Sequence, residues 1–158
     1  EGVVSIGSKA FWYCESLKSI TLPSTLREIG DEAFRSCKNL SEVIIPEGVV
    51  SIGSMAFELC RSLKSITLPS TLREIGDEAF AYCTNLSELI IPEGVESIGS
   101  RAFDSCSSLK YIILSSTLKE IGNGAFYCSN LEEVLIPRCI ESIVKSRVYS
   151  STKLVYID

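Results

Sequence analysis

The sequence predicts an α/β repeat solenoid, a right-handed coil with a parallel β-sheet on its concave face and short helical turns opposite. Two observations predict it. All six phenylalanines are 23 residues apart, from Phe11 to Phe126, and an alanine precedes each one. All five prolines fill one position of the same repeat, from Pro23 to Pro137, and Ser115 takes that position in the remaining unit. A fixed period of this length is typical of proteins built from stacked repeats.

Each repeat is expected to begin with a β-strand. Residues 17–23 read Leu-x-x-Ile-x-Leu-Pro, and the same pattern recurs in every unit. Side chains alternate across a strand, so the Leu and Ile positions face inward while Ser19 and Thr21 face outward. Proline then ends the strand because it has no N–H to donate to the ladder.

The remainder of each repeat should return the chain to the next strand. Leu26 and Ile29 belong to a second extended segment, and Gly30 allows a sharp bend. The segment Ala-Phe-x-x-Cys is long enough for one or two helical turns, with Phe and Cys facing the core. A polar residue precedes it at the position of a helix N-cap. These residues are Ser8, Asp31, Ser54, Asp77, Ser100 and Asn123.

No unit can bury its apolar side alone, so the units are expected to stack as one domain over residues 1–158, with about six repeats. Residues 138–158 resemble a degenerate C-terminal capping repeat, in which Ile143 keeps its core position but Val148 replaces the phenylalanine. The chain starts inside a repeat, which suggests a piece of a longer protein. An uncovered first coil could then pair with another chain, so self-association through this edge is expected.

The combined repeat resembles a known family. The pattern Leu-x-x-Ile-x-Leu-Pro, followed by Ile-Gly-x-x-Ala-Phe-x-x-Cys, is similar to the BspA-like leucine-rich repeats of bacterial and protozoan surface proteins. The resemblance covers residues 3–136 and weakens after them. It implies a cell-surface or secreted protein, and several family members act in adhesion to host components. It implies no catalytic residues.

Composition argues against several classes of function. The formal net charge is −5, there is no basic run, and there is no histidine. Nucleic-acid binding would require clustered Lys and Arg, so a nucleic-acid partner is not expected. No apolar run approaches the ~20 residues of a membrane-spanning helix, so membrane insertion is not expected. An enzyme is not expected either, because a Cys or Ser nucleophile lacks a histidine base.

Cysteine forms a column of its own, since six of the seven cysteines follow the repeat and only Cys139 lies outside it. The chain has no Cys-x-x-Cys pair and no histidine, so neither a metal site nor a cofactor is expected. Spacing alone leaves disulfides between neighbouring coils open. We interpret the column as small buried hydrophobic side chains.

The outward positions of the strands supply a candidate binding surface. Lys and Glu alternate between adjacent coils there, which favours cross-strand charge compensation. In the C-terminal half, apolar residues replace polar ones within a charged rim, as at a contact site. The alternative is ordinary β-propensity. The predicted patch consists of Glu88, Ile90, Lys110, Tyr111, Ile113, Glu132, Glu133 and Leu135.

A second candidate surface comes from an internal duplication. Residues 1–46 and 47–92 agree at 38 of 46 positions, and seven of the eight differences lie around the expected helical turn. These positions are either solvated and free to vary, or a diversified recognition rim of apolar and aromatic anchors. The candidate rim residues are Trp12, Tyr13, Leu59 and Tyr82.

These observations favour a non-enzymatic module that binds a protein ligand, such as a host surface or matrix protein, through the concave sheet face. The alternative is a structural spacer, or a consensus-built scaffold, that has no ligand of its own. Regular repetition of this kind is also what repeat design produces.

Overall fold

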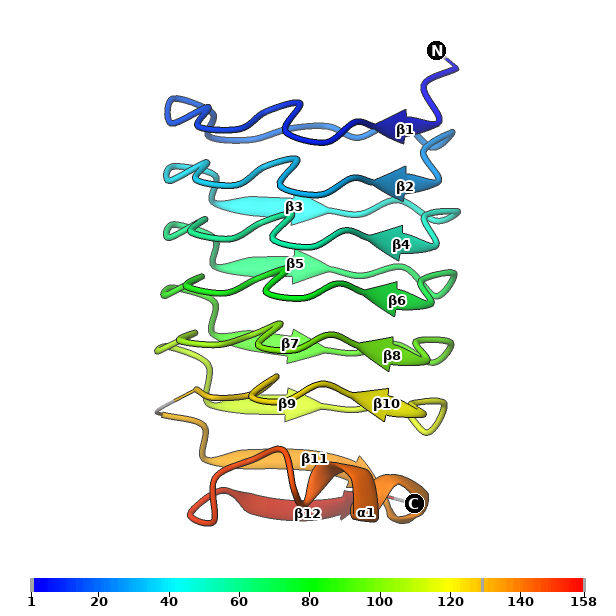
Figure 1. The fold of residues 1–158 in the computed structure, drawn as a ribbon, viewed down its shortest axis with the longest axis vertical. Coiled ribbons are helices and arrows are strands. Elements are labelled where there is room, and N and C mark those ends of the chain that lie inside the picture. Colours follow the sequence, from blue (N-terminus) through cyan, green and yellow to red (C-terminus); the bar gives the residue numbers. More distant parts are fainter. Residues whose placement is uncertain (1, 129, 158) are drawn as a thin grey trace.

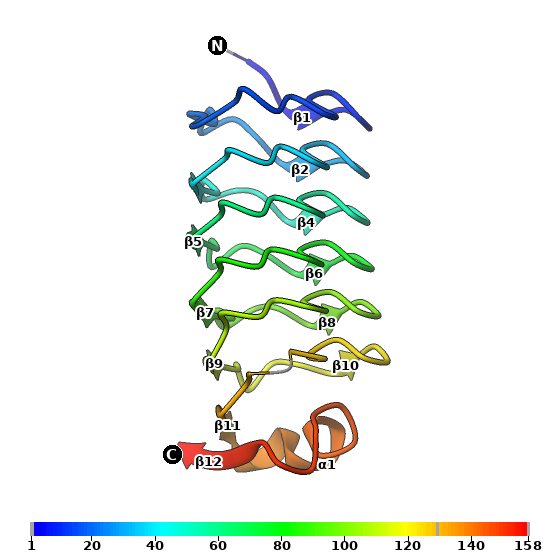
Figure 2. The same ribbon diagram turned by 90° about the vertical axis from the view of Figure 1, so that its left-hand side faces the viewer.

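The computed structural model describes residues 2–128 and 130–157 and contains a single stack of coils, one for each repeat (Figure 1). The predicted fold class is confirmed, because the chain is a parallel β-solenoid with little helix. The coils lie almost directly above one another in both views (Figures 1 and 2), so the face expected to be concave is close to flat. No helix among the described residues has the length and apolar character needed to cross a membrane.

Short strands form one continuous sheet along the stack. Each has an outward Ser or Glu followed by an inward Ile, and each pairs in parallel with the strand one coil away. The second extended segment of the repeat is therefore a strand. The six strands, in sheet order, are β1 (Ser5–Ile6), β2 (Glu28–Ile29), β4 (Ser51–Ile52), β6 (Glu74–Ile75), β8 (Ser97–Ile98) and β10 (Glu120–Ile121).

Longer strands lie on another side of the stack, and their outward side is called the long-strand face below (Figure 2). They form a two-stranded sheet of β3 (Glu42–Ile44) and β5 (Ser65–Thr67), and a four-stranded sheet. The four strands are β7 (Glu88–Ile90), β9 (Tyr111–Ile113), β11 (Glu133–Pro137) and β12 (Lys153–Ile157). Residues 17–22 of the first coil have the predicted sequence pattern but no assigned strand.

The core consists of stacked columns of like side chains. The six phenylalanine rings form one column, with neighbouring centroids 5.0 to 5.8 Å apart and ring planes within 8° of parallel. Phe34 and the four phenylalanines after it are fully buried, whereas Phe11 in the first coil is half-buried. Truncating one such ring to alanine typically costs about 3–5 kcal/mol. Phe11 belongs to the first coil, through which the chain is expected to self-associate, and this self-association stays a prediction.

The Ala-Phe-x-x-Cys segment is a run of turns, so the short helix expected in each repeat is absent from the described coils. The Phe57 N–H donates to the Ala79 carbonyl oxygen of the next coil at 2.7 Å. The Leu59 N–H donates to that of Ala81 at 2.9 Å. The N–H of Glu58, which lies between these two residues, donates to the carbonyl oxygen of Met55 in its own coil.

This alternation explains why a helix does not form. A helix directs all its N–H groups into its own bonds, whereas here every second N–H binds the neighbouring coil. Successive N–H groups must then point in different directions, and two residues of each such turn, four positions apart, adopt the left-handed conformation. Met55 and Leu59 have φ values of 55° and 62°, and eight further non-glycine residues among those described behave alike.

Two kinds of coil alternate along the stack, which accounts for the 46-residue period. In the short-strand column, Ser51 lies between Glu28 and Glu74, and Ser97 lies between Glu74 and Glu120. Identical coils would place carboxylates one coil apart, where like charges repel. The alternation separates them with a hydroxyl group.

The turn beside the short strands alternates in the same way. Asp31 Oδ1 accepts the Ser54 N–H of the next coil at 2.8 Å, and Asp77 Oδ1 accepts that of Ser100 at 2.6 Å. These side chains were expected to cap a helix within their own repeat. Because no helix forms there, they join one coil to the next instead.

The C-terminal segment contains the helix. Arg138–Ile140 form a 3-10 turn, η1, and Glu141–Val144 form α1, before β12 pairs in register with β11. Ile140 and Val144 are buried, whereas Ile143 is only partly buried. Ile143 packs against the core without being fully buried, so it keeps the expected core position only in part. Residues four apart share a helix face, and that face here is formed by Ile140 and Val144.

Candidate protein-binding face

The long-strand face carries a column of apolar side chains in the C-terminal half. Strand register places Ile90 opposite Ile113, Ile113 opposite Leu135, and Leu135 opposite Val155. Ile90 is 63% exposed, and the other three are partly exposed. The structure thus brings together the three apolar aliphatic residues of the predicted patch. Val155 was missed, although the last half-strand already had the alternating pattern that identifies its outward position.

A second outward row runs beside this apolar column. Glu88 lies opposite Tyr111, Tyr111 lies opposite Glu133, and Glu133 lies opposite Lys153. The Tyr111 ring is 45% exposed. Its hydroxyl donates to Glu132 Oε2 at 3.3 Å. This row therefore places one aromatic side chain next to the aliphatic column.

Charges around the patch are mostly paired. Lys110 Nζ lies 3.0 Å from Glu132 Oε1, and Lys153 Nζ lies 2.7 Å from Glu133 Oε1. Hydrogen bonding between the first two raises the pKa of Lys110 and lowers the pKa of Glu132. The expected cross-strand compensation thus occurs for Lys110. Among the described residues Glu88 forms no ion pair, because Lys110 lies diagonally across from it.

A recess of about 410 Å³ opens at the end of the apolar column. Ile90 and Ile113 lie at its side, and Leu114, Pro137 and Ile157 complete much of its apolar lining. Ser115 also lines it and is 3% exposed. One feature of the sequence marks this recess, namely the serine that replaces proline at position 115.

The residues of the candidate rim do not form one surface. Trp12 and Tyr13 make an edge-to-face pair with ring centroids 4.7 Å apart. Tyr13, Leu59 and Tyr82 share the left-handed position of their coils, but Ser36 occupies this position between the first two. The rim therefore consists of an aromatic pair in the first coil and a separate pair formed by Leu59 and Tyr82 in adjacent coils.

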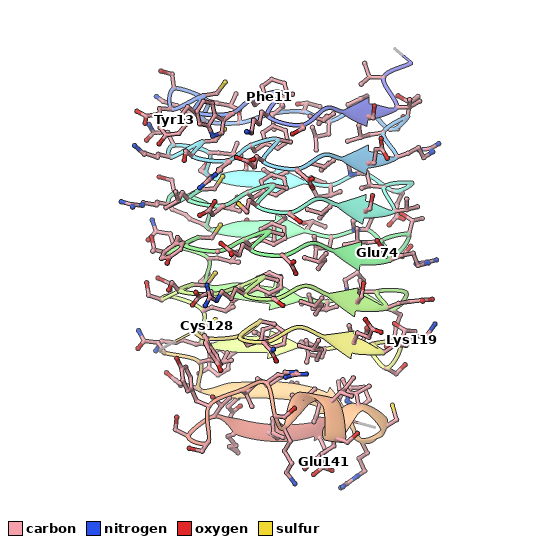
Figure 3. All side chains as sticks on the ribbon, viewed as in Figure 1. Phe11, Tyr13, Glu74, Lys119, Cys128 and Glu141 are labelled. Atoms are coloured by element: carbon pink, nitrogen blue, oxygen red, sulfur yellow. The ribbon has the colours of Figure 1, made fainter. Side chains whose placement is uncertain are left out.

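A larger polar groove of about 870 Å³ follows the short strands. It is lined by the outward Ser and Glu side chains of β4, β6, β8 and β10, and by Ser142 and Arg147 near α1. In Figure 3, Glu74 and Lys119 of this groove lie at the opposite edge of the stack from Tyr13. The sequence did not predict this groove.

The cysteine column is half-buried at Cys14 and fully buried in the five coils that follow. The Cys83 thiol donates to the Phe57 carbonyl oxygen of the preceding coil at 3.2 Å, and the cysteines one coil above and below do likewise. All seven cysteines are free thiols. Burial raises the pKa of Cys37 to about 11, and burial also raises the pKa of Cys60 well above its usual range. The described residues contain no group of three His, Cys, Asp or Glu that could hold a metal ion.

Repeats that pair an inward Leu/Ile strand with an ordered return segment define a leucine-rich-repeat solenoid. A model of the BspA-type leucine-rich-repeat region matches residues 4–93 and 51–158, with six copies. The chain belongs to this family. Proteins of this fold are in general non-enzymatic scaffolds. None of the curated proteins compared with the chain matches it.

Solved bacterial proteins have the same architecture. The T. pallidum leucine-rich-repeat protein TpLRR is 31% identical with a TM-score of 0.76, over 87% of this chain and 69% of that one. A leucine-rich cell surface protein of Faecalibacterium prausnitzii is 30% identical with a TM-score of 0.66, over 84% and 42%. The pneumococcal vaccine antigen PcpA shares the fold at 21% identity with a TM-score of 0.71, over 90% and 42%. The chain spans less than half of the last two proteins.

Proposed function

We propose that this chain is a protein-binding module of a surface or secreted protein, and that it acts in adhesion through the long-strand face. The observation that carries the proposal is the unbroken outward column of Ile90, Ile113, Leu135 and Val155 beside the exposed ring of Tyr111. A contiguous apolar patch with a polar rim is typical of an interaction site on a soluble domain.

The chemistry of this face favours a protein ligand. Interfaces combine an apolar centre containing aromatic side chains with a charged rim, and a few buried anchors supply most of the binding free energy. Ile113 lies at the centre of this patch, between Ile90 and Leu135 in register. The ion pairs Lys110–Glu132 and Lys153–Glu133 form a rim on the same strands.

Two comparisons support a surface location. The chain belongs to the BspA-type family, and a relative with 30% identity is described as a cell surface protein. A module displayed at a bacterial surface would meet proteins of a host surface or of an extracellular matrix. We therefore assign the ligand to this class.

The test compares two isoleucines that differ in position along the stack but not in local structure. Ile90 and Ile44 each end a three-residue long strand and are 63% and 69% exposed. Only Ile90 belongs to the patch, because Ile44 lies opposite Thr67. Binding to immobilised matrix proteins should fall at least about tenfold, or 1.4 kcal/mol, in Ile90→Asp. Ile44→Asp should bind as the parent does. Equal affinities of the two variants would refute the assignment of this face.

A structural spacer remains the second candidate. The near-identity of residues 1–46 and 47–92 favours it, because selection for one ligand would not require the same outward residues in two places. The spacer predicts that neither the parent nor the two variants bind matrix proteins. It also predicts that deleting residues 47–92 changes length without changing binding.

A further inference from the structure

The recess beside the apolar column occurs where the repeat departs from its own pattern. Register places Ser115 between Pro92 and Pro137, because Ile113 lies opposite both Ile90 and Leu135. The same position holds proline in five units of the sequence and serine only here. The pyrrolidine rings of the neighbouring coils therefore lie on either side of Ser115.

The walls of the recess suit such a ring. Pro92 and Pro137 lie on either side of Ser115, and Ile90, Ile113 and Ile157 add aliphatic surface. The serine is buried, and its hydroxyl is already engaged with Thr117 Oγ1 at 3.1 Å. Glu93 also lines the recess, but its carboxylate accepts the N–H and the hydroxyl of Ser116 at 3.0 and 2.9 Å. The polar groups here are satisfied, so the recess offers an occupant apolar contact.

We infer that the Ser115 recess receives a proline side chain from an extended segment of the protein ligand. This inference rests on the proposed function, since the recess shares Ile90 and Ile113 with the proposed binding face. The ring takes the place of the one that the repeat lacks, between Pro92 and Pro137. Proline-rich segments also dock on exposed aromatic side chains at low entropic cost, because their extended conformation is already formed.

Tyr111 lies in reach of the same segment. It is exposed on the same side of β9 as Ile113, and Ser115 follows two residues later. Four strand residues span roughly 13 Å. A polyproline segment rises about 3.1 Å per residue, so six residues cover that distance and more. One proline can then occupy the recess while another contacts the Tyr111 ring.

The experiment titrates acetylated, amidated hexaproline into the protein and follows the isoleucine methyl signals by NMR. The methyl groups of Ile90, Ile113 and Ile157 should shift, while that of Ile44 should not. Hexaglycine is the control peptide. Ser115→Pro restores the residue that the other units carry, so this variant is expected to fold and should weaken hexaproline binding at least tenfold.

A second variant separates the effect of filling the recess from the effect of proline on the backbone. Ser115→Val adds methyl groups to the recess floor without a ring and should also weaken binding. If the parent shows no shifts at several millimolar peptide, or if both variants bind hexaproline as well as the parent does, the inference is wrong. Loss of matrix binding in Ile90→Asp, together with absent hexaproline shifts, would retain the binding face and reject only the proline recess. Hexaproline shifts without any effect of Ile90→Asp on matrix binding would reject only the face.

Discussion

The Cys60 thiol donates a hydrogen bond to the carbonyl oxygen of Phe34, 26 positions earlier in the chain, at 3.2 Å. The phenylalanine ring and the thiol belong to adjacent core columns, so this bond joins one coil to the preceding coil through a side chain. A thiol suits the position because it combines the volume of a small hydrophobic group with a weak donor. The cysteine column therefore contributes to stacking, in addition to filling space.

Burial makes these thiols poor nucleophiles, since the thiolate is the reactive form. The pKa of Cys37 is about 11, and burial also raises the pKa of Cys60. We expect iodoacetamide at pH 8 to modify the exposed Cys139 rapidly in the folded protein, and the half-buried Cys14 more slowly. The five buried cysteines should react only after unfolding. Mass spectrometry of time points checks this, and rapid modification of Cys60 in the folded protein would contradict it.

Backbone strain in the turns gives a second prediction. Ser105 has a φ of 58°, whereas Ser100 in the same coil is not among the residues with positive φ. Both serines become more flexible in the unfolded chain when replaced by glycine. Only Ser105→Gly also removes a left-handed side chain, which costs about 1–2 kcal/mol.

Ser105→Gly should therefore be more stable than Ser100→Gly by about 1–2 kcal/mol. Urea unfolding followed by circular dichroism measures both free energies of unfolding. Gly124 lies 23 residues after Arg101, whose φ is 54°, and has a φ of 68° itself, so Gly124→Ala should destabilise the protein. Equal stability of the two serine variants would show that the left-handed turn carries no strain.

Charge alternation along the short strands gives a third prediction. Ser97 lies directly opposite Glu74 on one side and Glu120 on the other. Ser97→Glu places three carboxylates on adjacent strands, and like charges at this spacing destabilise by about 0.2–1 kcal/mol per pair. The loss should be largest at low ionic strength and should shrink in 1 M salt, where charges are screened within about 3 Å.

Ser97→Gln is the matched control, because it has nearly the same size without the charge. It should be more stable than Ser97→Glu in low salt, and the two should converge as salt is added. Thermal unfolding at several salt concentrations measures the difference. A constant difference between the variants would mean that the two-coil period does not serve to separate charges.

The extent to which sequence predicted the structure follows from where the hydrogen bonds lie. Phe34 and Phe57 were placed in one column correctly, because a 23-residue period forces equivalent residues onto neighbouring coils. The outward side chains of Ile90, Ile113 and Leu135 were also identified, since strand alternation fixes the side of the sheet. The turn around Met55 was wrongly predicted as helix. The sequence of this turn is compatible with a helix, but alternate N–H groups bind the next coil. Local helix propensity contains no information about hydrogen bonds to another coil.

The volume of the recess and the side-chain pairings of the last strand could not be predicted from the sequence. The recess at Ser115 depends on the residues of three coils and on Ile157 at the end of β12. The pairing of Lys153 with Glu133 requires the register of β12 on β11, which a degenerate repeat does not specify. Exceptions to the repeat were nevertheless informative, because the single serine in the proline column marks the recess.

The last prediction concerns Glu58, which is buried at the turn edge with its Oε2 atom 2.6 Å from Arg35 Nε. Burial raises the pKa of Glu58, and the positive charge of Arg35 only partly offsets this. The folded state therefore binds the proton more tightly than the unfolded state does. The stability that protonation contributes is complete below the usual glutamate pKa and is lost as the pH rises through the raised value.

Glu58→Gln cannot lose this contribution, so its stability relative to the parent should increase as the pH is raised from about 4 to 7. Glu47→Gln should show the reverse. The backbone N–H and the hydroxyl of Ser70 lower the pKa of Glu47, so the parent gains stability from this carboxylate above the usual pKa and loses it as the pH falls. Urea unfolding of the three proteins at pH 4, 5.5 and 7 measures both slopes. If the stability relative to the parent changes with pH in the same direction in both variants, burial does not govern the titration of Glu58. Its contact with Arg35 would then dominate.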